Sequence, residues 1–229
     1  MIETILRDYY ARGRGFDVSR VQLGIRQMTG LFALSDSKAC QACHRLPARQ
    51  DRTECNEEVL KVNSSDTIVD VVNFEEFLSQ FEKVPTSVRC DFLIADHGMS
   101  NRKIIFCDLT CSEAKYVEDN SSIRNGNKRA KAFQQMKRSI ETLMDETNSN
   151  HSLIAVNLLT YAEKVCLFAW RDYHVSDAPS PAQRGNATAN MRAFIHTPSV
   201  MSSQLTACNE VVGHFFVFKQ VKFPCVYEF

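Results

Sequence analysis

Two aspartates, Asp91 and Asp108, interrupt two apolar segments of the chain, and their carboxylates are the first groups that suggest chemistry. Asp91 opens the run CDFLIA, and Asp108 lies near the end of the run KIIFCDLT. An ionised carboxylate in an apolar strand is costly unless it is paired or bound to a metal ion. Two such carboxylates on paired strands predict a divalent-cation site. A metal-dependent phosphodiesterase is therefore the first hypothesis.

The two aspartates need strands and helices to position them. Residues 88–95 and 103–110 are predicted to be strands, joined by a turn at residues 96–98. Aromatic and leucine side chains at helical spacing predict a helix within residues 74–81. The clearest amphipathic pattern predicts a second helix from residue 129 to about residue 146.

The rest of the chain supplies the surrounding elements. We predict helices at 2–12 and 20–34, a loop or small insertion at 36–66, strands at 153–159 and 164–170, a long surface loop at 176–200, and one or two strands within 211–229. This order predicts an α/β fold with a central mixed β-sheet flanked by helices. The apolar central strands indicate a sheet covered on both faces. The expected division is an N-terminal helical region with a cysteine-containing loop, 1–64, and an α/β core with C-terminal strands, 65–229.

Within this order, the residues resemble the PD-(D/E)XK nuclease superfamily, which has a restriction-endonuclease-like core. In that pattern an Asp starts one strand, and an acid on the next strand is followed by one residue and then usually by Lys. The matching residues are Asp91 and the triplet Asp108-Leu109-Thr110. The resemblance covers about residues 65–170 and leaves the N- and C-terminal elaborations unexplained. Cys90 stands where the pattern has Pro, and Thr110 stands where it usually has Lys.

The resemblance implies a set of site residues. Asp91, Asp108 and the Leu109 carbonyl would bind Mg²⁺ or Mn²⁺, which prefer such oxygen ligands. The preceding helix would add an acid, Glu75 or Glu76, and the following helix a glutamine, Gln134 or Gln135. The usual Lys is taken to orient the attacking water and stabilise developing charge, and Thr110, which stands in its place, can do neither as a cation. Its role would therefore pass to Lys115, just beyond the strand, or to Lys131 on the next helix. Thr110 shares a strand face with Asp108, whereas Lys103 should point away.

A basic segment follows the two predicted strands. Six cations lie between Asp119 and Glu141 with no acid among them: Arg124, Lys128, Arg129, Lys131, Lys137 and Arg138. Such a segment can contact phosphates through charge and backbone amides. The alternative is an ordinary solvated helix face.

A second cluster could bind a different metal. Cys40 and Cys43 have zinc-knuckle spacing, and His44 or Cys55 could add ligands. A complete set would need a further partner from elsewhere in the chain. The alternative is three free thiols in a loop.

Composition limits the function classes. The chain has 229 residues, 44% hydrophobic and 24% charged, with zero formal net charge, so no global field favours nucleic acid or membrane. No signal peptide is visible, and no stretch approaches the ~20 apolar residues that span a bilayer. Nine cysteines, mostly within apolar runs, fit reduced thiols in a cytoplasmic protein.

These observations favour a metal-dependent nuclease that hydrolyses nucleic acid, and DNA is the favoured hypothesis for the substrate. The resemblance alone implies a context in prokaryotic antiviral defence or mobile-element biology. The alternative is a catalytically degenerate relative that binds nucleic acid or acts as a scaffold subunit, and a zinc-stabilised interaction module is a third hypothesis. No membrane partner is expected, while a protein complex or a homo-oligomer stays open.

Overall fold

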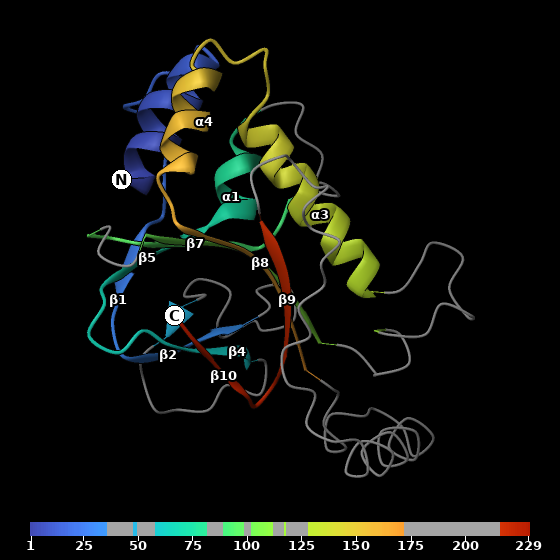
Figure 1. The fold of residues 1–229 in the computed structure, drawn as a ribbon. Coiled ribbons are helices and arrows are strands. Elements are labelled where there is room, and N and C mark those ends of the chain that lie inside the picture. Colours follow the sequence, from blue (N-terminus) through green and yellow to red (C-terminus); the bar gives the residue numbers. More distant parts are fainter. Residues whose placement is uncertain are drawn as a thin grey trace.

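The computed structural model describes residues 1–35, 48–49, 58–81, 89–98, 102–111, 117, 128–171 and 216–229. These residues form three layers: helices, a six-stranded main sheet and a four-stranded small sheet (Figure 1). The predicted α/β fold with a central mixed sheet flanked by helices is confirmed.

The main sheet has the strand order β1-β5-β6-β7-β8-β9. Its strands are β1 (Arg26–Met28), β5 (Val69–Asn73), β6 (Phe92–Asp96), β7 (Lys103–Cys111), β8 (Glu163–Arg171) and β9 (Val217–Lys222). Strands β1, β5, β6 and β7 pair antiparallel, and β7, β8 and β9 pair parallel. The carboxyl ends of the three parallel strands therefore meet at one edge of the sheet.

The small sheet has the order β10-β4-β2-β3 and covers one face of the main sheet. Its strands are β2 (Leu31–Ser35), β3 (Ala48–Arg49), β4 (Glu58–Asn63) and β10 (Val226–Glu228). A core of buried aliphatic and aromatic side chains lies between the two sheets, with contributions such as Val62, Ile94 and Leu167. The boundary expected at residue 64 falls between β4 and β5, and β1 pairs with β5 across it.

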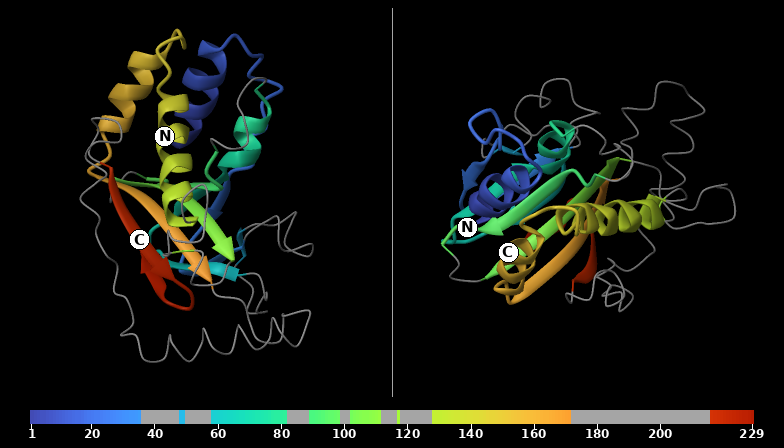
Figure 2. Two further views of the ribbon diagram at one scale, coloured as in Figure 1. Left: turned by 90° about the vertical axis from the view of Figure 1, so that its right-hand side faces the viewer. Right: turned by 90° about the horizontal axis from the view of Figure 1, so that it is seen from above.

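The helices cover the opposite face of the main sheet, as both views in Figure 2 agree. They are η1 (Thr4–Ala11), wound as a π-helix, α1 (Phe74–Ser79), α3 (Lys128–Leu143) and α4 (His151–Leu159). A second core fills the space between them and the sheet, with side chains such as Phe77, Phe106 and Met136. Both faces of the main sheet are thus covered, which explains why its central strands are apolar on both sides.

Most predicted elements near the two aspartates are confirmed. The helix within 74–81, the strands at 88–95, 103–110 and 164–170, the helix from 129 and the final strands all form, with shifts of a few residues at their ends. The predicted loop at 176–200 lies outside the described residues. Of the helices in the described ranges, none is both long and apolar enough to cross a membrane.

Three predicted elements are wrong. Within residues 20–34, strands β1 and β2 form instead of a helix, and Gly30, at φ 68°, turns the chain between them. The stretch 36–66, expected to be a loop or small insertion with few core residues, contains in its described part β4, whose Val59, Leu60 and Val62 are fully buried. Residues 153–159 belong to helix α4 instead of a strand, with Ile154 buried one helical turn before Leu158.

Candidate functional site

Asp91 and Asp108 lie opposite each other across the β6–β7 pair. The antiparallel register places Phe92 opposite Cys107, so the next step brings Asp91 opposite Asp108. The Asp91 carboxylate reaches the next strand, where its Oδ2 accepts a hydrogen bond of 2.6 Å from the Leu109 backbone N–H. Asp91 is half-buried, and Asp108 is only 6% exposed.

Asp108 points to the helix-covered face of the main sheet. Side chains two residues apart on a strand share a face, and Phe106, two residues before Asp108, belongs to the core beneath the helices. Asp91 directly precedes β6, and its carboxylate is directed to the Leu109 N–H of β7. The structure therefore places the two predicted acids next to each other at one end of the β6–β7 pair.

Two buried thiols, Cys90 and Cys107, directly precede the two aspartates in the chain. Burial raises the pKa of both thiols well above the usual value for cysteine. The negative charges of Asp91 and Asp108 raise the pKa of both thiols further, while Ser139 opposes the shift at Cys90.

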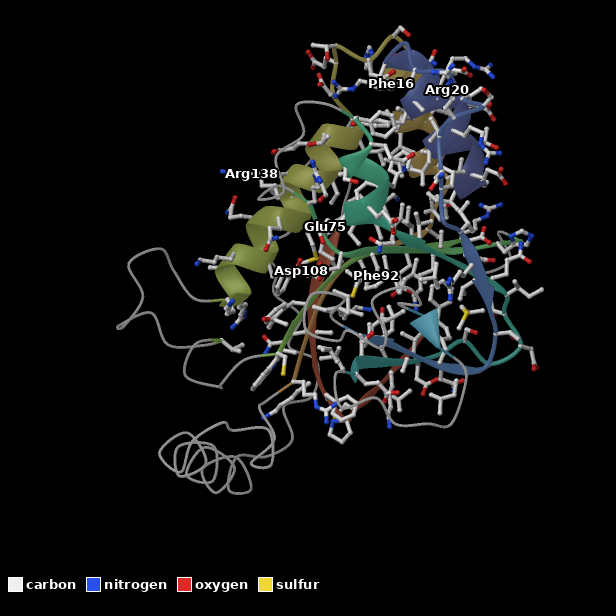
Figure 3. All side chains as sticks on the ribbon, turned by 180° about the vertical axis from the view of Figure 1, so that it is seen from behind. Phe16, Arg20, Glu75, Phe92, Asp108 and Arg138 are labelled. Carbon is white, nitrogen blue, oxygen red and sulfur yellow. The ribbon has the colours of Figure 1, made fainter. Side chains whose placement is uncertain are left out.

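Helix α1 begins directly on the Asp91 backbone. The N–H groups of Phe74 and Glu75 donate to the Asp91 carbonyl at 2.8 and 3.3 Å. The first turn is fixed by Asn73, whose side chain accepts from the Glu76 N–H at 3.1 Å. Of the two acids predicted to assist, Glu75 is half-buried and Glu76 is exposed. Figure 3 shows Glu75 at the sheet end of α1 and Asp108 on the sheet below.

Helix α3 docks on the two residues that precede Asp91. The Ser139 hydroxyl accepts from the Cys90 N–H at 2.8 Å, and Gln135 Nε2 donates to the Arg89 carbonyl at 3.3 Å. The predicted site residue Gln134 is exposed and lies one position away. Gln135 is therefore the glutamine that the helix presents beside the aspartates.

The same edge of α3 carries three of the predicted phosphate-binding cations. At 100° per residue, Lys128, Lys131 and Arg138 fall within about 60° of Gln135 on the helix surface. All three side chains are exposed. Figure 3 shows Arg138 on the outer side of α3, pointing away from the sheet. A basic edge thus runs along α3 on the side of the helix that carries Gln135.

The other predicted cations are placed differently. Arg129 and Lys137 are half-buried on the far side of α3, and Lys137 Nζ lies 3.9 Å from the Glu141 carboxylate. Arg124 and Lys115 lie outside the described residues. The predicted zinc cluster also lies outside them: Cys40, Cys43, His44 and Cys55.

Thr110 is buried at 8% exposure, two residues beyond Asp108 on the same strand face. The parallel register places it beside Trp170 of β8, which in turn lies beside Lys222 of β9. Lys222 Nζ lies over the Trp170 ring, 4.2 Å from its centroid. Sequence analysis did not find Lys222, because nothing in the sequence fixes the register of β9 against β8.

Lys103 points away from this site, as its strand parity predicts. Its Nζ lies 3.2 Å from Glu163 and 5.4 Å from the centroid of the Tyr227 ring, on the small-sheet side. Lys103 therefore does not supply a cation to the two aspartates.

The oxygen atoms at this site are of the kind that binds a hard cation such as Mg²⁺, but few of them are available. Within the described ranges, no group of three or more His, Cys, Asp or Glu side chains is arranged to hold a metal ion. The available oxygen donors are the carboxylates of Asp91 and Asp108 and the Leu109 carbonyl. One oxygen of Asp91 already accepts from the Leu109 amide. Mg²⁺ and Mn²⁺ are commonly held by one or two carboxylates with water and phosphate oxygens, so the residues fit such an ion.

Comparisons of the chain with protein-family models, with curated proteins and with solved structures found no match.

Proposed function

We propose that this protein is a metal-dependent nuclease with a restriction-endonuclease-like core, and that the nucleic acid it cleaves is DNA. The observation that carries the proposal is the position of Asp91 beside Asp108 at one end of the β6–β7 pair, with Asp91 oriented by the hydrogen bond from the Leu109 amide. Mg²⁺ and Mn²⁺ are commonly held in proteins by one or two carboxylates together with water and phosphate oxygens, which supports the proposal. A role in prokaryotic defence rests on the sequence resemblance alone.

The arrangement of the strands supports this proposal. Strands β5, β6 and β7 form an antiparallel meander, and α3 and α4 then connect β7 to the parallel strand β8. Asp108 and Thr110 stand near the carboxyl end of β7, and ligands of α/β sheets commonly bind at such ends. The exposed cations Lys128 and Lys131 come at the start of the connecting helix α3, beside this end.

Each residue has a distinct role in this proposal. A bound Mg²⁺ or Mn²⁺ would polarise the phosphodiester and lower the pKa of an attacking water. Asp91 and Asp108 would hold the ion, and the Leu109 amide orients Asp91. The basic edge of α3 would bind the phosphates that flank the scissile bond.

A second function, nucleic-acid binding without catalysis, is favoured by one observation. Thr110 is buried where a lysine would stand, and it carries no charge. If no other cation serves the site, the protein would act as a binding or scaffold subunit instead of an enzyme.

The test is Mg²⁺- or Mn²⁺-dependent cleavage of DNA and RNA by the wild type and by Asp108→Asn. The exposed carboxylate of Asp66, in the turn before β5, offers a matched control, Asp66→Asn. We expect Asp108→Asn to abolish cleavage while its far-UV circular dichroism stays unchanged, and Asp66→Asn to cleave normally. Equal cleavage by Asp108→Asn would remove Asp108 from the mechanism. Absence of cleavage in the wild type, followed by its appearance in Thr110→Lys, would favour the binding function.

A further inference from the structure

Lys222 occupies a position that the proposed function does not yet use. It ends β9, the third of the parallel strands, at the edge of the sheet where Asp108 and Thr110 stand. Thr110, Trp170 and Lys222 form one row across three neighbouring strands. Since neighbouring strands lie about 4.8 Å apart, the backbones at Thr110 and Lys222 are about 10 Å apart.

The side chain of Lys222 leans over this row toward β7. Its Nζ lies over the Trp170 indole, which is the aromatic ring that attracts cations most strongly. Trp170 is itself fixed, since it is 3% exposed and packs into the core under the helices. The lysine is half-buried. The ring therefore holds the ammonium at β8, the strand that lies between β9 and the strand of Asp108 and Thr110.

A positively charged group near Asp91 and Asp108 would favour the binding of a phosphodiester at this site. Asp91 and Asp108 place two carboxylates where a phosphodiester would have to approach, and like charges repel most strongly in a partly buried setting. Helix α3 packs over β7 and β8, and its exposed cations Lys128, Lys131 and Arg138 lie on the side of the helix that carries Gln135. Lys222 belongs to a different element, β9, and stands in the row of Thr110. A phosphate approaching the carboxyl ends of β7 and β8 could thus meet positive charge from the sheet as well as from α3.

We propose that Lys222, held on the Trp170 ring, binds a backbone phosphate of the nucleic acid beside Asp108 and Thr110. This inference rests on the proposed function, because it assigns a phosphate contact to the same site. It adds a second contact region, on β9, to that of α3.

The chain contains a matched control on the same strand. Lys219 also belongs to β9, but its Nζ lies 2.9 Å from a carboxylate oxygen of Glu163. It also lies 5.9 Å from the centroid of the Tyr227 ring, on the small-sheet side. Lys219 and Lys222 thus carry the same charge on the same strand but face opposite sides of the sheet.

The experiment measures binding of a fluorescein-labelled DNA duplex and of its single strand. It uses Asp108→Asn as the parent protein, so that cleavage does not interfere. Lys222→Gln, Lys222→Arg and Lys219→Gln are added to this parent, and affinity is measured over a series of salt concentrations. The chain has one tryptophan, Trp170, so its fluorescence during a titration with unlabelled DNA reports directly on the Lys222 position.

We expect Lys222→Gln to weaken duplex binding about tenfold, as loss of a charged hydrogen bond does. The slope of log affinity against log salt should fall by about 0.9, which corresponds to one phosphate contact. Lys222→Arg should keep most of the affinity, Lys219→Gln should bind like the parent, and the tryptophan signal should respond to DNA in the parent.

Several results would overturn the inference: parental affinity and slope in Lys222→Gln, an equal loss in Lys219→Gln, or no DNA binding by the parent. Cleavage by the wild type together with unchanged binding by Lys222→Gln would refute the Lys222 contact and leave the nuclease proposal intact. Lys222-dependent binding without any cleavage would support the contact and refute the nuclease activity.

Discussion

Asp91 makes two structural contacts in addition to its proposed role with a metal ion. Its carbonyl accepts the first N–H groups of α1, and its carboxylate accepts the Leu109 N–H of β7. A helix start and a strand are therefore both attached to one residue. A substitution at Asp91 would affect stability as well as catalysis, and the two effects must be separated.

The first prediction separates the structural and chemical roles of Asp91. Asp91→Ala removes the acceptor for the Leu109 N–H, and a buried donor without a partner costs about 1–3 kcal/mol. Asp91→Asn keeps an acceptor oxygen and should lose clearly less free energy of unfolding. Both variants should lose Mg²⁺-dependent cleavage. Urea denaturation measures the first effect, and equal stability of the two variants would show that the 2.6 Å bond contributes nothing.

At the residue scale, the sequence predicted the neighbouring positions of Asp91 and Asp108 but not the side chains around them. Their position at one end of two paired strands follows from the antiparallel hairpin of β6 and β7, which is a local feature of the sequence. The choice of Gln135 over Gln134 depends on how α3 is rotated against the sheet, and the place of Lys222 depends on the register of β9. These depend on packing between segments far apart in the sequence, which a local pattern does not encode.

Helix α4 shows why an apolar run is ambiguous at the level of an element. Its sequence, HSLIAVNLL, is apolar and partly β-branched, which favours a strand. In the fold only Ile154 and Leu158 are buried, while Leu153, Val156 and Leu159 are 47%, 59% and 52% exposed. A run this short shows no reliable spacing of apolar residues, so its sequence does not distinguish a helix from a strand. In the fold, α4 forms part of the helical connection that parallel strands β7 and β8 require.

The second prediction tests this arrangement of α4. Ile154→Ala should lower the free energy of unfolding by about 2–4 kcal/mol, because it leaves a cavity in the core under the helices. Val156→Ala, on the exposed side of the same helix, should change it by less than about 0.5 kcal/mol. Both values come from urea denaturation followed by circular dichroism. A large loss at Val156 would mean that this side is covered, contrary to its 59% exposure.

At the scale of the whole molecule, the N-terminal segment is bound to the connection between α3 and α4. Arg14 lies 2.6 Å from the Asp145 carboxylate, and the Asn148 side chain donates to the Tyr10 carbonyl at 2.9 Å. Gly13 packs so closely on Asn148 that a Cβ would overlap it. These contacts join residues more than 130 positions apart in the sequence. They hold the N-terminal segment against the connection between α3 and α4, within the layer of helices.

The third prediction concerns the pH dependence of this connection. The Thr147 backbone N–H, together with Arg14, lowers the pKa of Asp145 in the folded protein, although partial burial opposes the shift. Its contribution to stability is therefore present above the unfolded pKa of about 3.9 and is lost as pH falls through the lower folded value.

Asp145→Asn should accordingly be less stable than the wild type at pH 7, by no more than about 1 kcal/mol because the pair is partly exposed. The difference should shrink as the pH falls below about 4. Urea denaturation at pH 7, 4 and 2.5 measures it. Arg14→Gln should reproduce only part of the loss, since the bond from Thr147 remains. A difference that grows in acid would contradict the assigned direction.

The pairing of β10 with β4 has a consequence for how the chain acquires its fold. Residues 226–228 complete a sheet whose neighbouring strand lies at residues 61–63. A chain emerging from the ribosome would hold β4 with this edge unpaired until residues 226–228 had been made. Contacts of such long sequence separation slow folding, and an exposed strand edge can pair with other chains. The interval between synthesis of β4 and synthesis of β10 is therefore a period in which this edge is open to aggregation.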